Sequence, residues 1–198
     1  MARHPEVAFW VCPGDLAAED GSYPTPRSPL YWIKGNNEEF DFVAAQPAGS
    51  GTLANLRYVP NGIPVKAHGL MLAGLGGTFA PTWYEKLPSE LRQLSARDDR
   101  RRHFVHEEVK ALKTLHGIDV FLSHEAARPF PLARVRDAGK TPVNEVLSAM
   151  RPRLHLFGHH HIYTVAERQH VPSISLEKAR DSYLLLDGKT LAHQRLTI

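Results

Sequence analysis

Residues 154–161 read Leu-His-Leu-Phe-Gly-His-His-His, a short apolar run followed by a histidine-rich turn. The first four residues have the length and composition of a buried β-strand. The glycine after them allows the chain to turn tightly. In extended backbone, residues two apart face the same way, so His159 and His161 are predicted to point into one site while His160 points elsewhere.

Three more loops place a polar side chain shortly after an apolar strand. The pairs of predicted strand and following residue are 7–12 with Asp15, 30–33 with Asn36, and 120–122 with His124. In open α/β sheets, ligand sites form where loops leave the carboxyl ends of the strands. The four loops are therefore predicted to converge on one sheet edge.

The side chains on these loops form a consistent set of metal ligands. Asp15 has two carboxylate oxygens that can bridge two cations, and Asn36 offers an amide oxygen. Imidazole nitrogens come from His124, His159 and His161. A nitrogen and oxygen set without thiolate suits one or two ions of Mn, Fe, Zn or Ni. Each residue alone also fits a structural role, such as a hydrogen-bonded turn, and only the ordered set favours a metal site.

The rest of the chain predicts an α/β fold. Helices are expected at 103–116, closed by Gly117, and at 142–150, where Thr141 would cap the helix with Glu145 as its partner. Residues 65–75 read as a strand that bends at 67–69. The C-terminal segment 183–196 reads as a hairpin that turns at Asp187-Gly188. Strands that alternate with helices favour a sheet with helices packed on its faces.

Composition is that of a globular domain. The chain has 198 residues, 42% hydrophobic and 23% charged, which predicts a single domain over 1–198. It contains no apolar run of about 18 residues, so no membrane association is expected.

The N-terminal residues do not match a signal peptide and Cys12 is the single cysteine, so a cytoplasmic setting is expected. A net charge of +3 suits a phosphorylated substrate without establishing nucleic-acid binding.

The ordered motifs resemble those of the calcineurin-like metallophosphoesterase family. They are Gly14-Asp15, Gly35-Asn36-x-Glu38, Ser123-His124 and Gly158-His159-x-His161. Within that family, the middle of the chain resembles the RNA lariat debranching branch, in the segments LMLAGLGGTF at 70–79 and RRHFVHEEVKALKTLHGIDVFLSHEAARPF at 101–130.

The resemblance implies a β-sandwich flanked by helices and a two-metal centre that hydrolyses phosphomonoesters or phosphodiesters with a metal-activated water. Asp15 would bridge the metals. Asn36, His124 and His159 would complete one site, and His161 would hold the other. Small phosphate esters or nucleotides are the implied substrates. Asn37 and His160 are the candidate catalytic residues, and His160 and Arg128 are candidates for contact with the substrate.

Two departures from the family pattern matter. The Asp-x-His motif expected on an earlier strand is absent from residues 1–14, which predicts an N-terminally shortened sandwich, unequal metal sites and a sheet edge that a homodimer could cover. Asn37 stands where the family has a catalytic histidine, and asparagine donates a hydrogen bond but transfers no proton. Two alternatives stay open: a catalytically weak metal- or nucleotide-binding relative, and an RNA-processing protein.

Overall fold

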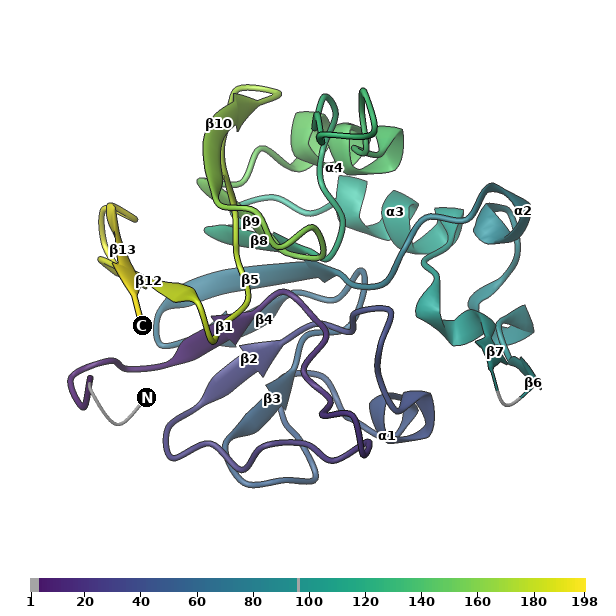
Figure 1. The fold of residues 1–198 in the computed structure, drawn as a ribbon, viewed down its shortest axis with the longest axis horizontal. Coiled ribbons are helices and arrows are strands. Elements are labelled where there is room, and N and C mark those ends of the chain that lie inside the picture. The colour runs from purple at the N-terminus through teal and green to yellow at the C-terminus, as the bar shows by residue number, and fades with distance from the viewer. Residues whose placement is uncertain (1–3, 96) are drawn as a thin grey trace.

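The computed structural model describes residues 4–95 and 97–198 and contains two main sheets (Figure 1). The expectation that the N-terminus is not a signal peptide involves residues 1–3, which lie outside the described residues. The smaller sheet is parallel, in the order β1 (Trp10–Cys12), β2 (Leu30–Trp32), β3 (Leu56–Tyr58).

The larger sheet has six strands in the order β10-β11-β9-β8-β5-β4. Their bounds are β4 Val65–Ala67, β5 Leu70–Leu75, β8 Val120–Ser123, β9 Leu154–Phe157, β10 Thr164–Arg168 and β11 Val171–Ser175. The four central strands are parallel, and each edge strand is antiparallel to its neighbour. The predicted bend in 65–75 is confirmed, because β4 and β5 form an antiparallel pair there.

The two sheets pack face to face around one apolar core. Tyr31 and Ile33 of the smaller sheet and its flank contact the same cluster as Leu72, Leu122 and Leu156 of the larger sheet. Burial of such side chains is the main stabilising term for a layered fold. The predicted α/β fold is confirmed, with a β-sandwich at its centre.

Helices cover the outer faces of this sandwich. The helices α3 (His106–Lys113) and α4 (Thr141–Met150) lie on the larger sheet, where Phe121 packs among their apolar residues. The short α1 (Phe40–Ala44) contacts the smaller sheet through Val43. The remaining elements are α2 Pro81–Tyr84, η1 Pro88–Glu90, β6 Gln93–Ser95, β7 Asp98–Asp99, η2 Arg100–Arg102, and the hairpin β12 Ser182–Leu186 with β13 His193–Thr197. No described helix is long and apolar enough to cross a membrane.

Several local predictions were wrong in detail. The first predicted helix is shorter at both ends, because Val105 is extended and Thr114 is already the C-cap, so Gly117 lies beyond the helix end. Thr141 is the first helical residue instead of a cap, and Glu145 forms an ion pair with Lys113 at 3.1 Å.

The C-terminal hairpin is confirmed, but its turn is longer than predicted. The last paired residues are Leu186 and His193, so residues 187–192 form the connection. Asp187 accepts hydrogen bonds from Lys189 and Thr190 and thereby stabilises a wider loop than an Asp-Gly turn.

Candidate metal centre

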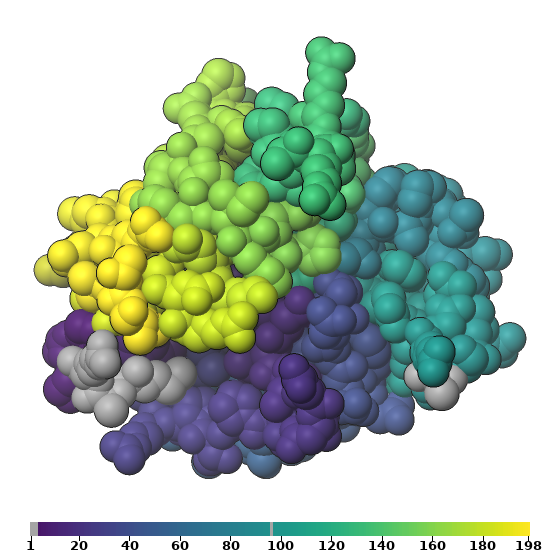
Figure 2. Space-filling view, viewed as in Figure 1, coloured from purple at the N-terminus to yellow at the C-terminus, as the bar shows by residue number. Residues whose placement is uncertain are grey.

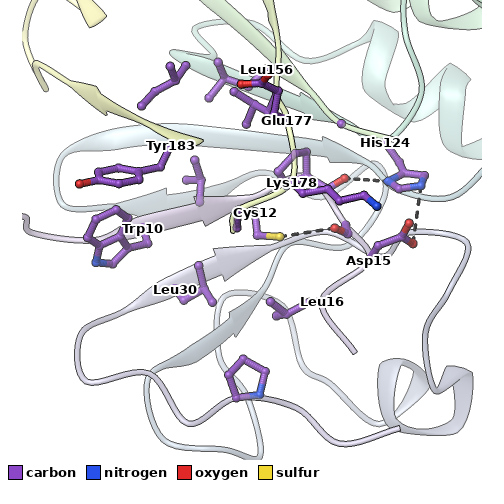
Figure 3. Close-up of a pocket in the computed structure, with 18 of the residues that line it drawn as sticks. Trp10, Cys12, Asp15, Leu16, Leu30, His124, Leu156, Glu177, Lys178 and Tyr183 are labelled. Atoms are coloured by element: carbon purple, nitrogen blue, oxygen red, sulfur yellow. Dashed lines mark hydrogen bonds and ion pairs between the residues drawn. The ribbon is translucent and has the colours of Figure 1, made fainter. Parts of the chain in front are cut away.

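Three of the predicted ligands converge after β1, β8 and β9. Asp15, His124 and His159 each offer an atom that lies within 4.8 Å of the atoms offered by the other two. The side chains of Asp15 and His124 face each other across the end of β1 (Figure 3). Asn36, which follows β2, adjoins the same group through its Oδ1, 2.9 Å from Nε2 of His124.

The protonation of His124 follows from its partners. Nδ1 lies 2.8 Å from the carbonyl oxygen of Pro13, which can only accept, so Nδ1 must donate. Burial lowers the pKa of His124, so the ring is neutral and Nε2 carries a lone pair. A histidine held this way is oriented as metal-bound histidines generally are, with the second nitrogen fixed by a hydrogen bond.

Two oxygens lie near Nε2 of His124, Oδ1 of Asn36 at 2.9 Å and Oδ1 of Asp15 at 3.7 Å. Three electron-rich atoms at such separations repel one another unless a cation lies between them. This donor set, two oxygens and one nitrogen with a second imidazole nearby, fits a divalent transition metal.

Two glycines allow the loops to approach this closely. Gly14 has φ +99°, a left-handed conformation that side chains rarely adopt, and a Cβ there would lie 2.6 Å from Nδ1 of His124. A Cβ on Gly35 would lie 2.1 Å from Oδ1 of Asp15. The motif glycines are therefore required by the contact between the Asp15 and Asn36 loops.

Glu38 connects the Asp15 and Asn36 loops through hydrogen bonds. Its Oε1 accepts from the backbone N–H groups of Leu16 and Gly35, both at 3.1 Å. Its Oε2 accepts from Ala17 at 3.3 Å and from the Tyr23 hydroxyl at 2.8 Å. Burial raises the pKa of Glu38, and these donors oppose that shift.

Asn37 holds Asp15 from the solvent side. Its backbone N–H donates to Oδ1 of Asp15 at 2.9 Å, and its side-chain amide donates to Oδ2 at 3.1 Å. The residue predicted to act in catalysis thus contacts the carboxylate predicted to bridge the metals. It can orient that carboxylate through hydrogen bonds, and it has no proton to transfer.

The backbone of the His159–His161 turn differs from the extended conformation that was predicted. His159 and His161 have φ values of 64° and 56°, so the backbone is left-handed instead of extended. The ring of His159 lies 4.7 Å from that of His124. The ring of His160 stacks on Phe130, 5.0 Å between ring centroids, and meets the ring of His159 edge-on at 4.8 Å.

His161 is exposed and lines the rim of the cavity that contains Asp15 and His124. It is not among the three residues whose ligand atoms cluster. Its role as ligand of a second metal stays a prediction, as does the catalytic role of His160. Arg128 is engaged elsewhere, because its Nε donates to Oδ2 of Asp137 at 2.7 Å.

A buried polar network supports the turn that carries His124. Oγ of Ser123 donates to the backbone oxygen of Glu125 at 2.5 Å and lies 2.8 Å from Nε2 of His155. Nδ1 of His155 lies 3.1 Å from Oγ of Ser173 on the adjacent strand. Burial lowers the pKa of His155 to about 3, so its ring is neutral at physiological pH.

The fold also brings cationic side chains near the centre. Lys178, from the loop before β12, lines the cavity and extends its amine toward Asp15 (Figure 3). Arg101 and Arg102 line a second cavity of about 210 Å³ together with Asn36 and Asn37. Neither position lies near a ligand motif in sequence, so only the fold brings these charges to the site.

Together, the fold and the centre define an α/β protein with a sandwich core and a mixed nitrogen and oxygen site at the strand ends. Comparisons with known proteins find distant relatives of the chain. The lariat debranching enzyme of Schizosaccharomyces pombe is 26% identical over 162 residues, which cover 70% of this chain and 34% of that protein. The lariat debranching enzyme of Drosophila melanogaster is 26% identical over 170 residues, which cover 76% of this chain and 32% of that protein.

These relatives are distant and longer than the matched region. The chain spans about a third of the length of the curated relatives it matches. A solved crystal structure superimposes with a TM-score of 0.54 at 12% identity, over 86% of this chain and 66% of that one, which supports the fold. No family model matches the chain. The similarity therefore supports a distant relationship to lariat debranching enzymes.

Proposed function

We propose that this protein is a metal-dependent phosphoesterase whose preferred substrates are phosphodiesters. The observation that carries the proposal is the convergence of ligand atoms from Asp15, Asn36, His124 and His159, each from a loop that follows a strand. Asp15, Asn36, His124 and His159 would hold the principal ion. His161 would serve a second ion at the rim.

When bound, such an ion neutralises charge on the phosphoryl oxygens and lowers the pKa of a coordinated water. The protein's own residues then orient the substrate. Asn37 keeps the Asp15 carboxylate in place through two hydrogen bonds. Lys178, on the cavity wall, can pair with a phosphate oxygen, as can Arg102 beside Asn37.

We favour phosphodiesters over phosphomonoesters as substrates because both named relatives are lariat debranching enzymes. A branched RNA is the specific substrate that this similarity suggests. The alternative is a metal-binding protein with little turnover. Asn37 favours this alternative, because asparagine cannot protonate a leaving alcohol.

The test is turnover by the purified protein with added Mn²⁺. Rates are compared on bis-p-nitrophenyl phosphate, p-nitrophenyl phosphate, and branched and linear RNA. His159→Ala should abolish turnover, while His116→Ala, which alters an exposed histidine away from the site, should not. Tight metal binding without turnover on any of these substrates would favour the binding protein. Equal turnover by His159→Ala and the native protein would refute the site.

A further inference from the structure

A large apolar groove runs between β1 and the C-terminal hairpin. It is part of a cavity of about 1670 Å³ that reaches from Asp15 and His124 along residues 9–12 to residues 182–186. On its floor lie Leu72, Val120 and Leu156, all from the inner face of the larger sheet. The N-terminal and C-terminal segments that border it lie next to each other on the face seen in Figure 2. We call this feature the β1–β12 groove.

One wall of the groove is a strand edge with free backbone groups. In the smaller sheet, β1 has a described neighbour on one side only, β2. Trp10 donates its N–H to Pro29 at 2.8 Å, and Cys12 accepts from Ile33 at 3.2 Å, so both use their backbone groups on the β2 side. Because alternate residues of a strand point their backbone groups to opposite sides, the N–H and C=O of Val11 point into the groove.

The opposite wall is a second free edge. Ile198 donates to Asp181 at 3.1 Å and Asp187 donates to Ala192 at 2.9 Å, which sets the alternation of bonds between β12 and β13. In that register the backbone groups of Leu184 and Leu186 point away from β13, as do those of Ser182, whose N–H donates to the Lys178 carbonyl at 3.2 Å. Within the described residues, β13 is the one strand that pairs with β12.

The groove is also where the central core stays open. Val11, Leu70, Leu176, Leu184 and Leu186 pack against the core between the sheets but are only partly buried. The cavity exceeds the ~300–1,000 Å³ usual for small-molecule sites. A small apolar ligand would also leave both rows of backbone donors and acceptors unpaired.

We propose that the β1–β12 groove binds an extended peptide strand from a partner chain, apolar at alternate positions. Its backbone would pair with β1 on one side and with β12 on the other. Its inward side chains would pack on Leu72, Val120 and Leu156. The strand would join the smaller sheet to the hairpin, giving a continuous sheet of six strands opposite the six-stranded sheet. This mode of recognition adds a strand to an exposed edge, with backbone bonds for affinity and alternating pockets for specificity.

The first experiment selects binding peptides of about ten residues, long enough to span a strand of average length, from a random displayed library. Leu184→Lys places a charge in the groove, and Val165→Lys places one on β10, where Val165 is 51% exposed. Selected peptides should alternate apolar and polar residues. They should bind Leu184→Lys roughly tenfold more weakly or worse and Val165→Lys unchanged. Failure to select binders, absence of alternation, or equal loss in both variants would overturn the proposal.

The second experiment measures amide hydrogen exchange of the unaltered protein, and it remains decisive if Leu184→Lys does not fold. The amides of Val11, Leu184 and Leu186 should exchange rapidly in the free monomer and become protected when a selected peptide binds. Protection already present in the monomer would contradict an open groove. Protection that grows with protein concentration, together with dimerisation, would assign the groove to a second copy of the chain and overturn the partner strand.

Discussion

The inner and outer halves of the metal centre are built in different ways. The inner half, Asp15, Asn36 and His124, is fixed by other groups: His124 is 1% exposed and donates to Pro13, and Asp15 accepts from Asn37. The outer half, the turn that carries His159 and His161, rests on left-handed backbone and ends in an exposed ring. The ligands of the inner half are thus already oriented for metal binding, whereas the orientation of the outer ligands depends on the conformation of the 159–161 turn.

This difference predicts unequal contributions to metal binding. A ligand whose rotamer is already fixed by packing and hydrogen bonds loses little entropy when it binds an ion. An exposed side chain loses its freedom at that moment. Removal of an inner ligand should therefore cost far more affinity than removal of His161.

The largest expected effect comes from His124→Ala. It removes a ligand and leaves the Pro13 carbonyl without its donor, which costs about 1–3 kcal/mol of stability. Mn²⁺ affinity should fall by more than about 100-fold, beyond the 10–100-fold loss seen for residues that only support ligands. Calorimetric titration measures the affinity and thermal melting confirms the fold. His116→Ala is the control, and unchanged affinity in His124→Ala would show that the inner half does not hold the ion.

A second prediction concerns the network beneath the inner half and uses pH. The His155 pKa is about 3 in the folded protein and near 6.5 when unfolded, so below pH 6.5 the unfolded chain binds the additional proton. Stability should therefore fall with decreasing pH from about 6.5 toward 3, with roughly 2 kcal/mol lost from this group by pH 5.

Urea unfolding at pH 7 and pH 5 checks this expectation. His155→Gln cannot titrate, so it should lose less stability over the same interval, whatever its stability at pH 7. The exposed control His116→Ala should keep the native slope. An equal pH dependence in His155→Gln and the native protein would show that His155 is not the group responsible.

The sequence predicted the elements that local signals determine. The apolar run of β9 and the bend between β4 and β5 are marked by composition and turn residues, and the structure confirms both. The predicted helix cap at Thr141 is wrong, because tertiary contacts engage both residues of the predicted capping pair. Arg128 donates to the Thr141 hydroxyl at 3.4 Å, and Glu145 forms an ion pair with Lys113. Helix ends are set by such contacts as much as by the local motif.

The site was predictable where its residues follow strands and unpredictable where they come from other segments of the chain. Asp15, Asn36 and His124 follow strands, so their convergence could be expected from the sequence alone. Lys178 lines the same cavity as Asp15, and Arg102 lines the same cavity as Asn37. These residues are far apart in the sequence, and no local sequence pattern predicts that they lie near each other. The support from His155 was missed for the same reason, since its partners come from two neighbouring strands.

A third prediction concerns stoichiometry. The inner residues and His159 should retain one Mn²⁺ per chain through dialysis, while a second ion held by Asp15 and His161 should be labile. His161→Ala should weaken only the second binding event, by a few-fold, because the exposed ring is not prearranged. Elemental analysis after dialysis, followed by calorimetry, measures both events. Two equally tight ions in the native monomer would contradict the division into halves.

The smallest expected effect concerns Asn37 and the leaving group. Asn37 donates two hydrogen bonds to Asp15 and has no proton to transfer, so esters with good leaving groups should react much faster than alkyl esters. Asn37→His keeps the backbone donor and adds a group that titrates near neutral pH, which should narrow this gap by a few-fold. Asn37→Asp is the control, since it introduces a charge beside Asp15 without supplying an imidazole and should slow all esters. The measurement is kcat/KM across nitrophenyl, phenyl and alkyl phosphodiesters with saturating Mn²⁺. A native protein that is indifferent to the leaving group would show that proton transfer does not limit the reaction, and Asn37 would then serve only to orient Asp15.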